Sequence, residues 1–365
     1  MKVLLCTPFD FSGKTPGGIS VWAKNIYDYN RNNSSDVILD IYSTTRTRYI
    51  NENTGIIKRI YYGIIDYFHF IRDIRRKVRE GGYDVVHMNS TASFGALKDI
   101  VLCKCLKKLT KVFIHYHFGR IPTLSKQRNF EWKMVSKTIS LAHKVIVMDA
   151  ESYRTLDSIG YRNVIEIPNP YSPTLDIKAA ELAGKVERKK GRVLYIGRVF
   201  RQKGIYELVS ACAKLSNIEL RIVGPYEEVD RQNLLAIAEN ASWIDFVGPV
   251  GYDKVVEELM SCEICCLPSY TEGFPNIVLE CMVTKTPIVA TPVGAIPEML
   301  DFDGKPCGIR INPRNVDDIV NALGTLLNNG EMQDRIVTNG YKRVSDLYNV
   351  QAVVLQLYNT WHDII

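Results

Sequence analysis

Two glutamates lie eight positions apart in Glu272-Gly-Phe-Pro-Asn-Ile-Val-Leu-Glu280, shortly after an apolar run. Pro275 is well placed to begin a helix that carries Glu280, with Glu272 and Gly273 in the preceding turn. Such a helix start binds anions, because free N–H groups and the positive dipole end point outward. Glu280, roughly 7 Å further on at about 1.5 Å per residue, can accept hydrogen bonds from a sugar hydroxyl. The arrangement suits a nucleotide-sugar; the alternative is two ordinary surface carboxylates.

The elements that must position these residues are predicted from short apolar runs that alternate with helical patterns along the whole chain. Two such series predict two doubly wound parallel sheets, in two Rossmann-like domains facing a central cleft. The domains are expected at residues 1–170 and 191–347, with a linker at 171–190 and a last helical segment at 348–365. The expected strands are Lys2–Cys6, Val37–Tyr42, Asp84–Met88, Val112–His117, Lys144–Met148, Val164–Ile167, Arg192–Ile196, Glu219–Val223, Ile244–Val247, Ile264–Leu267 and Pro287–Ala290.

Several short motifs accompany the glutamate pair in a fixed order. They are Gly17-Gly18, Gly197-Arg198, Lys203-Gly204, Gly224-Pro225 and Thr291-Pro-Val-Gly-Ala-Ile-Pro-Glu298. Together with the E-x7-E segment, this set resembles the family 4 retaining glycosyltransferases, closely over residues 190–300 and more loosely in the first half. The resemblance implies the GT-B fold, with the C-terminal helix crossing back onto the first domain.

The resemblance also assigns roles to residues of the second half. Arg198 and Lys203 would bind the donor diphosphate, whose charge grows as the glycosidic bond breaks and which therefore needs a cation nearby. Glu280 would bind the nucleotide ribose, and Glu272 the transferred sugar. The donor would also contact the backbone of the turn between them, at Gly273, Phe274, Pro275 and Asn276. Without the resemblance, exposed loop cations are an equally good interpretation of Arg198 and Lys203.

In the first half, Gly17 and Gly18 follow the first expected strand, where glycines let backbone N–H groups approach a phosphate closely. A plain turn before a helix is the alternative. His115 and His117 share one face of a strand end, because they lie two residues apart. The family has a site histidine at this point, and we favour His117 over His115, as a hydrogen-bond partner of the transferred sugar. A structural histidine is the alternative for each.

The net charge and composition of the chain indicate what kind of partner it binds. The chain has 365 residues and a net charge of +6. Residues 1–190 carry a net +13, whereas residues 191–365 carry −7. A basic first half favours an anionic membrane surface or a diphosphate-linked lipid as partner, and no nucleic-acid-binding motif is recognisable. The segment Tyr61–Arg79 combines aromatic and aliphatic residues with a basic end, typical of an interfacial helix; a core helix with basic residues in its last turn is the alternative.

Neither of two metal-like patterns predicts a metal site. Cys262 and Cys265 form a C-x-x-C pair inside an apolar run with no further ligands nearby, so buried thiols are expected. Asp301-Phe-Asp303 matches a D-x-D metal motif but has the composition of a surface turn. The nine irregularly spaced cysteines indicate a reducing compartment, and no signal peptide or membrane-spanning run is recognisable.

Taken with these observations, the resemblance implies a metal-independent, retaining glycosyltransferase without a cofactor, at the cytoplasmic face of a bacterial membrane. It would transfer a sugar from a nucleoside-diphosphate donor, with UDP-sugars favoured over GDP-sugars, to a hydroxyl of a lipid-linked or polysaccharide acceptor, in O-antigen or capsule synthesis. The alternatives are a nucleotide-sugar epimerase or phosphorylase on the same fold, or a catalytically silent subunit that binds nucleotide-sugars.

Overall fold

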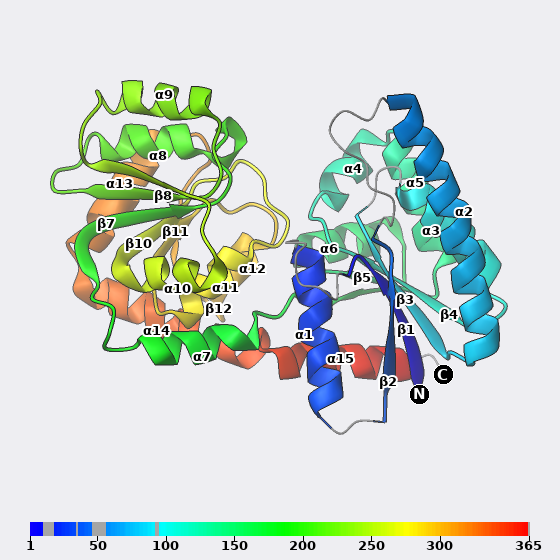
Figure 1. Cartoon of the computed structure of the whole chain (residues 1–365). Helices are drawn as coiled ribbons and strands as arrows, with labels where there is room; N and C mark the ends of the chain where they lie inside the picture. Colours follow the sequence, from blue (N-terminus) through cyan, green and yellow to red (C-terminus); the bar gives the residue numbers. More distant parts are fainter. Residues whose placement is uncertain (10–17, 34–35, 46–55, 92–94, 364–365) are drawn as a thin grey trace. The chain divides into compact units, whose positions relative to one another are not determined.

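The computed structural model describes residues 1–9, 18–33, 36–45, 56–91 and 95–363, with the backbone alone at 56–61, 63 and 64. The chain divides into two compact units. Unit 1 comprises Met1–Pro170 and Val350–Ile365, and unit 2 comprises Tyr171–Asn349. Each unit contains its own six-stranded sheet with helices packed on it (Figure 1). The expectation of two parallel-sheet α/β domains is therefore confirmed.

The sheet of unit 1 is parallel and has the strand order β2-β1-β3-β4-β5-β6. Its strands are β1 (Lys2–Thr7), β2 (Ile38–Ser43), β3 (Val85–Ser90), β4 (Lys111–Tyr116), β5 (Lys144–Val147) and β6 (Val164–Glu166). Its helices are α1 (Gly18–Asn32), α2 (Ile56–Gly81), α3 (Gly95–Leu106), α4 (Ile121–Gln127), α5 (Phe130–Leu141), α6 (Ala150–Ile159) and α15 (Val350–His362). All six strands lie within a few residues of the predicted positions.

Two separate apolar cores cover the two faces of this sheet, because alternate residues of a strand point to opposite faces. On one face, α2, α3 and α5 contribute buried residues such as Ile74, Leu102 and Val135. On the other face, α1 and α15 contribute Trp22 and Trp361. The last helix of the chain thus packs against the first one, as the red and blue ribbons of unit 1 show (Figure 1).

The sheet of unit 2 is also parallel, in the order β14-β11-β10-β7-β8-β9. Its strands are β7 (Lys189–Ile196), β8 (Glu219–Val223), β9 (Ile244–Gly248), β10 (Cys262–Leu267), β11 (Ile288–Ala290) and β14 (Ile309–Arg310), beside a separate hairpin of β12 (Asp301–Phe302) and β13 (Lys305–Pro306). Its helical segments are α7 (Pro173–Leu182), η1 (Arg201–Lys203), α8 (Ile205–Cys212), α9 (Glu228–Ile237), α10 (Tyr252–Ser261), α11 (Asn276–Val283), α12 (Ile296–Met299), α13 (Val316–Leu327) and α14 (Gly330–Leu347).

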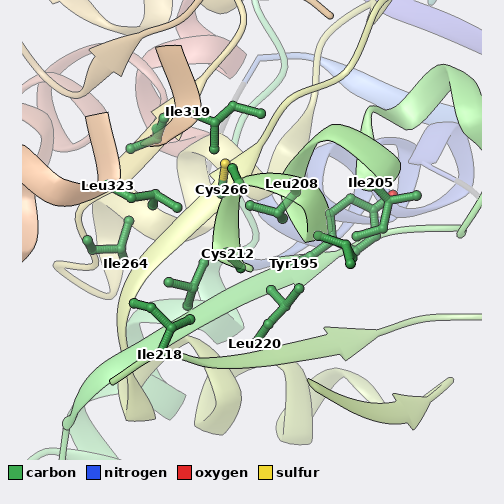
Figure 2. Close-up of a cluster of buried hydrophobic side chains, with 14 of the residues drawn as sticks. Tyr195, Ile205, Leu208, Cys212, Ile218, Leu220, Ile264, Cys266, Ile319 and Leu323 are labelled. Carbon is green, nitrogen blue, oxygen red and sulfur yellow. The ribbon is translucent and has the colours of Figure 1, made fainter. Parts of the chain in front are cut away.

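A continuous apolar core joins this sheet to α8 and α13. Figure 2 shows Leu208 and Cys212 of α8 together with Ile319 and Leu323 of α13, beside side chains of β7, β8 and β10 such as Tyr195. These side chains are almost fully buried. Burial of each large apolar side chain contributes about 1.5–3 kcal/mol, so this core holds the carboxyl ends of the strands, and the loops that follow them, in fixed positions.

The predicted linker at 171–190 is wrong for most of its length. It contains α7 and the first residues of β7, and it belongs to unit 2. Pro173 occupies the first turn of α7, where the missing N–H has no partner to lose. Leu175 is fully buried, and Lys178 pairs with Asp253 of α10 at 3.2 Å, which fixes α7 to the rest of the unit.

Candidate active site

The centre of the candidate site in unit 2 is an ion pair between two residues that the sequence analysis selected separately. Lys203 Nζ lies 2.6 Å from Glu272 Oε1, and the same oxygen accepts a hydrogen bond from Ser269 Oγ at 2.7 Å. The lysine and glutamate side chains are 25% and 12% exposed. A charge-assisted hydrogen bond in such a partly buried position is short and strong, so each residue fixes the orientation of the other.

A close approach between two loops brings this pair together. Lys203 ends η1, after β7, and Glu272 follows β10. The next residue, Gly204, has φ +69°, and a Cβ atom there would lie 1.9 Å from the carbonyl oxygen of Pro268. Only glycine permits this approach. The N–H of Tyr270 then donates to the carbonyl of Gln202 at 2.9 Å, which ties the two loops to each other.

A second loop fixes the backbone of the Glu272 turn from the other side. Gly294 has φ +59°, and a Cβ atom there would lie 2.4 Å from the carbonyl oxygen of Gly273 and 2.5 Å from that of Glu272. The N–H of Ala295 donates to the carbonyl of Gly273 at 2.9 Å. The motif at residues 291–298 therefore supports the turn through backbone contacts, which explains why it needs a glycine.

Glu280 lies on α11, whose N-cap residue is Pro275. The first N–H groups of an α-helix have no acceptors within the helix, so this turn presents donors beside the Lys203–Glu272 pair. Burial raises the pKa of Glu280 to about 7, and no cation pairs with its carboxylate in the described part of the chain. The side-chain oxygen of Asn276 is also buried without a hydrogen-bond partner among the described residues. The helix start thus carries polar groups that the protein itself leaves unsatisfied.

The remaining predicted residues are less tightly built into the site. Arg198 is exposed, and its carbonyl accepts a hydrogen bond from the hydroxyl of Tyr195 at 2.8 Å. Burial, followed by the charge of Glu272, raises the pKa of Tyr195. Gly17 lies outside the described residues, and Gly18 begins α1 with open space around it.

The two histidines of the first half differ in exposure. His115 lies in β4 and is completely buried, whereas His117 follows the strand and is half-buried. Burial, and then the neighbouring His87, lower the pKa of His117 to about 3, so its imidazole is neutral at pH 7. His117 is thus the more accessible of the two rings, although its Nε2 atom is buried. Its contact with a sugar stays a prediction.

Both metal-like patterns have structural explanations. Asp303 and Gly304 have positive φ values of 51° and 78°, as the turn of the β12–β13 hairpin requires, and Asp301 accepts from the N–H of Gly304 and from Arg310. Cys262 and Cys265 are buried in β10. Within the described residues, no cluster of histidine, cysteine and acidic residues has the arrangement of a metal site.

Three further residues contact the predicted site residues and were not predicted from the sequence. Ser269 orients Glu272 from three positions upstream, and Tyr195 contributes its hydroxyl to the Arg198 loop. His87 of β3 lies beside His115, its Nε2 atom 3.3 Å from Nδ1 of that residue. A signal for His87 was present, since neighbouring parallel strands place residues of one alternation on the same face.

Comparisons with solved structures define the class of fold. The sucrose-phosphate synthase from Thermosynechococcus elongatus superposes with a TM-score of 0.75 at 18% identity, covering 100% of this chain and 98% of that one. HepE of Anabaena, solved in complex with UDP, superposes with a TM-score of 0.73 at 17% identity, covering both chains completely. The protein has the GT-B fold of these structures.

For unit 2, sequence comparison gives a match to a family model as well as a fold. Residues 179–343 match the family model described as "Glycosyl transferases group 1". An MMP alpha-(1->4)-mannosyltransferase from Mycolicibacterium hassiacum is 31% identical over 158 residues, 42% of this chain and 38% of that protein. The capsular polysaccharide biosynthesis glycosyltransferase CapM from Staphylococcus aureus is 23% identical over 61% of this chain and 60% of its own length. The chain thus spans less than two thirds of either relative.

Proposed function

We propose that the protein is a retaining glycosyltransferase that uses a nucleoside-diphosphate sugar and needs no metal ion. The observation that carries the proposal is the partly buried Lys203–Glu272 pair beside the start of α11, within the residues that match the glycosyl transferases group 1 model. A cation and a helix N-terminus suit the diphosphate, and Glu280 suits the ribose hydroxyls. The unpaired state of Glu280 supports this role, because a ligand with hydroxyl donors would satisfy its carboxylate.

The proposed mechanism depends on where negative charge develops as the donor reacts. As the bond between the anomeric carbon and the phosphate oxygen breaks, negative charge grows on the leaving diphosphate, and Lys203, Arg198 and the N–H groups of α11 stabilise it. The acceptor oxygen forms its bond on the face that the diphosphate leaves, and the acceptor proton passes to a phosphate oxygen. Glu272 would bind sugar hydroxyls with its second oxygen, while its first stays on Lys203. His117 would donate or accept one further hydrogen bond to the sugar.

The donor and the acceptor class are inferred from relatives and charge. HepE binds UDP, which supports a UDP-sugar, and CapM acts in capsular polysaccharide synthesis, which supports a polysaccharide or lipid-linked acceptor. The basic first half of the chain is compatible with an acceptor that carries phosphate, held at the cytoplasmic face of a bacterial membrane.

The deciding experiment combines binding and stereochemistry. In a thermal-shift panel of UDP-, GDP- and ADP-sugars, one donor at a hundred times its Kd is expected to stabilise the protein by about 2.7 kcal/mol. With that α-linked donor and water as acceptor, proton NMR should detect the α-anomer of the free sugar before mutarotation. Appearance of the β-anomer first would refute retention, and binding without any hydrolysis or transfer would favour the silent subunit.

Metal independence is tested by chelation. Lys203, Arg198 and the helix start already supply the positive charge that Mg²⁺ would otherwise bring to the diphosphate. We therefore expect the rate of donor hydrolysis in excess EDTA to stay within about twofold of the rate without it. Loss of activity that Mn²⁺ restores would contradict this expectation and would make Asp301 and Asp303 candidates for metal binding again.

We further propose that the protein binds anionic membrane surfaces through α2. Along the described part of this helix, Ile74 and Val78 are buried in the core, whereas Arg72, Arg76 and Phe68 are 74%, 64% and 65% exposed. The apolar contribution is thus smaller than the composition of the helix suggests, and charge should dominate. None of the described helices is long and apolar enough to cross a bilayer.

We expect the protein to sediment with vesicles of anionic lipid at low salt, because each basic residue near the surface contributes about 1 kcal/mol to binding. High salt should release the protein, because salt screens exposed charges. Changing Arg72, Arg75, Arg76 and Lys77 together to Ser should abolish most of this binding. The matched control removes four exposed charges from unit 2, at Lys214, Lys254, Lys305 and Lys342, and should bind as the wild type does. Equal losses in both variants would show that overall charge, not α2, is responsible.

A further inference from the structure

Three histidines and two tryptophans form one cluster in unit 1, on the sheet face that α1 and α15 cover. His115 pairs with Asn89 in the β3–β4 register, which puts His87, two residues earlier on β3, on the same face. Ring centroids are 5.3 Å apart for His87 and His115, and 4.1 Å apart for His115 and His117. Trp22 of α1 lies edge-on to His115 and His117, at 5.0 Å from each.

The hydrogen bonds in this cluster have a fixed direction. The indole N–H of Trp361 can only donate, and it lies 3.1 Å from His87 Nδ1. That nitrogen must therefore accept, which leaves the proton of neutral His87 on Nε2, 3.3 Å from His115 Nδ1. His115 Nδ1 accepts in turn, so its own proton lies on Nε2. Burial lowers the pKa of His87 to about 3 and that of His115 well below its usual value, which keeps both rings neutral.

His117 depends on this arrangement for its orientation. Its ring is stacked on His115 with an angle of 30° between the ring planes, and its Nε2 atom is buried without a hydrogen-bond partner among the described residues. The hydrogen bond that the structure gives this residue is made by its backbone N–H, to the carbonyl of Ser90 at 3.0 Å. Ring packing against His115 and Trp22, rather than a side-chain hydrogen bond, therefore sets the direction of the imidazole.

We propose that Trp361 and His87 are positioning residues: they fix His115 as the neutral tautomer with its proton on Nε2, and His115 in turn sets the orientation of the His117 ring. This inference rests on the proposed function, because it needs a sugar beside His117. It assigns a role in the reaction to α15, the last helix of the chain, which carries none of the residues selected from the sequence.

The test uses the full-length protein and two pairs of variants. Trp361→Phe keeps an aromatic ring but removes the donor, and Tyr358→Phe, also on α15, removes a hydrogen bond to Asn30 of α1 without affecting the histidines. His87→Leu removes both hydrogen bonds of this residue, to Trp361 and to His115. In His87→Gln, the side-chain amide can still accept from Trp361 and donate to His115. The second pair keeps the inference testable if Trp361→Phe does not fold.

Two readouts are needed. Long-range proton–nitrogen NMR of the imidazoles should show single Nε2–H tautomers for His87 and His115 in the wild type and in Tyr358→Phe, and a changed His115 in Trp361→Phe and His87→Leu. In donor turnover, Trp361→Phe and His87→Leu should lower kcat about tenfold with KM within about twofold, and His87→Gln should recover most of the loss.

Wild-type tautomers in Trp361→Phe and His87→Leu, or altered tautomers with wild-type kcat, would overturn the inference. Loss of kcat in Tyr358→Phe as large as in Trp361→Phe would also overturn it, by showing that the anchoring of α15 is what matters. Absence of donor turnover in the wild type would instead refute the proposed function and with it the positioning role, while the NMR tautomers would still decide whether the hydrogen-bond chain exists.

Discussion

Lys203→Met is expected to lower kcat for the sugar donor by about a hundred- to a thousandfold, the usual effect of removing one group that stabilises charge in the transition state. In the wild type, Lys203 Nζ lies 2.6 Å from Glu272 Oε1, and the glutamate is 12% exposed. Under the proposed function, the variant removes a cation that binds the diphosphate, and it also leaves a partly buried carboxylate without its counter-ion. Steady-state kinetics of donor hydrolysis and transfer measure the effect.

Two further variants separate catalysis from folding. Lys214→Met removes an exposed lysine of the same unit that pairs with Asp317 at 2.9 Å, and its kcat should stay within about twofold of the wild type. Combining Lys203→Met with Glu272→Gln removes both charges, so it should recover stability in urea denaturation but not activity. If Lys203→Met is as active as Lys214→Met, the assignment of the ion pair to the donor site is wrong.

Glu280→Gln is expected to stabilise the ligand-free protein at pH 8 while it weakens donor binding about tenfold. Burial raises the pKa of Glu280 from 4.5 to about 7, so between these values the folded protein binds more protons than the unfolded chain does. The contribution of Glu280 to the free energy of unfolding is therefore most favourable below pH 4.5, and it falls as the pH rises to about 7. The loss amounts to roughly 1–3 kcal/mol, and a neutral side chain removes it.

Urea denaturation at pH 5 and pH 8 measures this difference, and calorimetric titration with the nucleoside diphosphate measures binding. Glu257, whose side chain is 44% exposed and pairs with Lys254 at 2.7 Å, supplies the control: Glu257→Gln should change neither the pH dependence nor the affinity. A Glu280→Gln protein that is less stable than the wild type at pH 8 would show that the carboxylate has a partner when no ligand is bound.

The strands were easier to predict from the sequence than the contacts between site residues. β8 was predicted with its true bounds, because the apolar residues Leu220 and Ile222 alternate with the charged residues Glu219 and Arg221, a purely local signal of a strand. β14 was missed, since two residues carry no periodicity. α7 was mistaken for a linker because the proline that begins a helix has the same local appearance as one in a loop.

At the site, sequence spacing selected Glu272 and Lys203 but could not show that they touch, because 69 residues separate them and the contact needs the approach of Gly204 to Pro268. The environment of Glu280 was also beyond prediction, since burial depends on tertiary packing. Likewise, His115 and His117 were predicted from the sequence, but their supporting residues were not. His87 lies 28 residues from its hydrogen-bond partner His115, and Trp361 lies 274 residues from its partner His87.

The discontinuous course of unit 1 affects how the protein folds during synthesis. α15 contributes Val353, Val354, Leu357 and Trp361 to the core beside β1, β3 and β4. The ribosome must therefore translate all of unit 2, residues 171–349, before this core can close. At about 5–20 residues per second this takes roughly 10–35 s. During that interval one sheet face of the nascent first unit has no cover from α15, and it exposes an apolar surface that chaperones bind, whereas unit 2 can fold as soon as it leaves the exit tunnel.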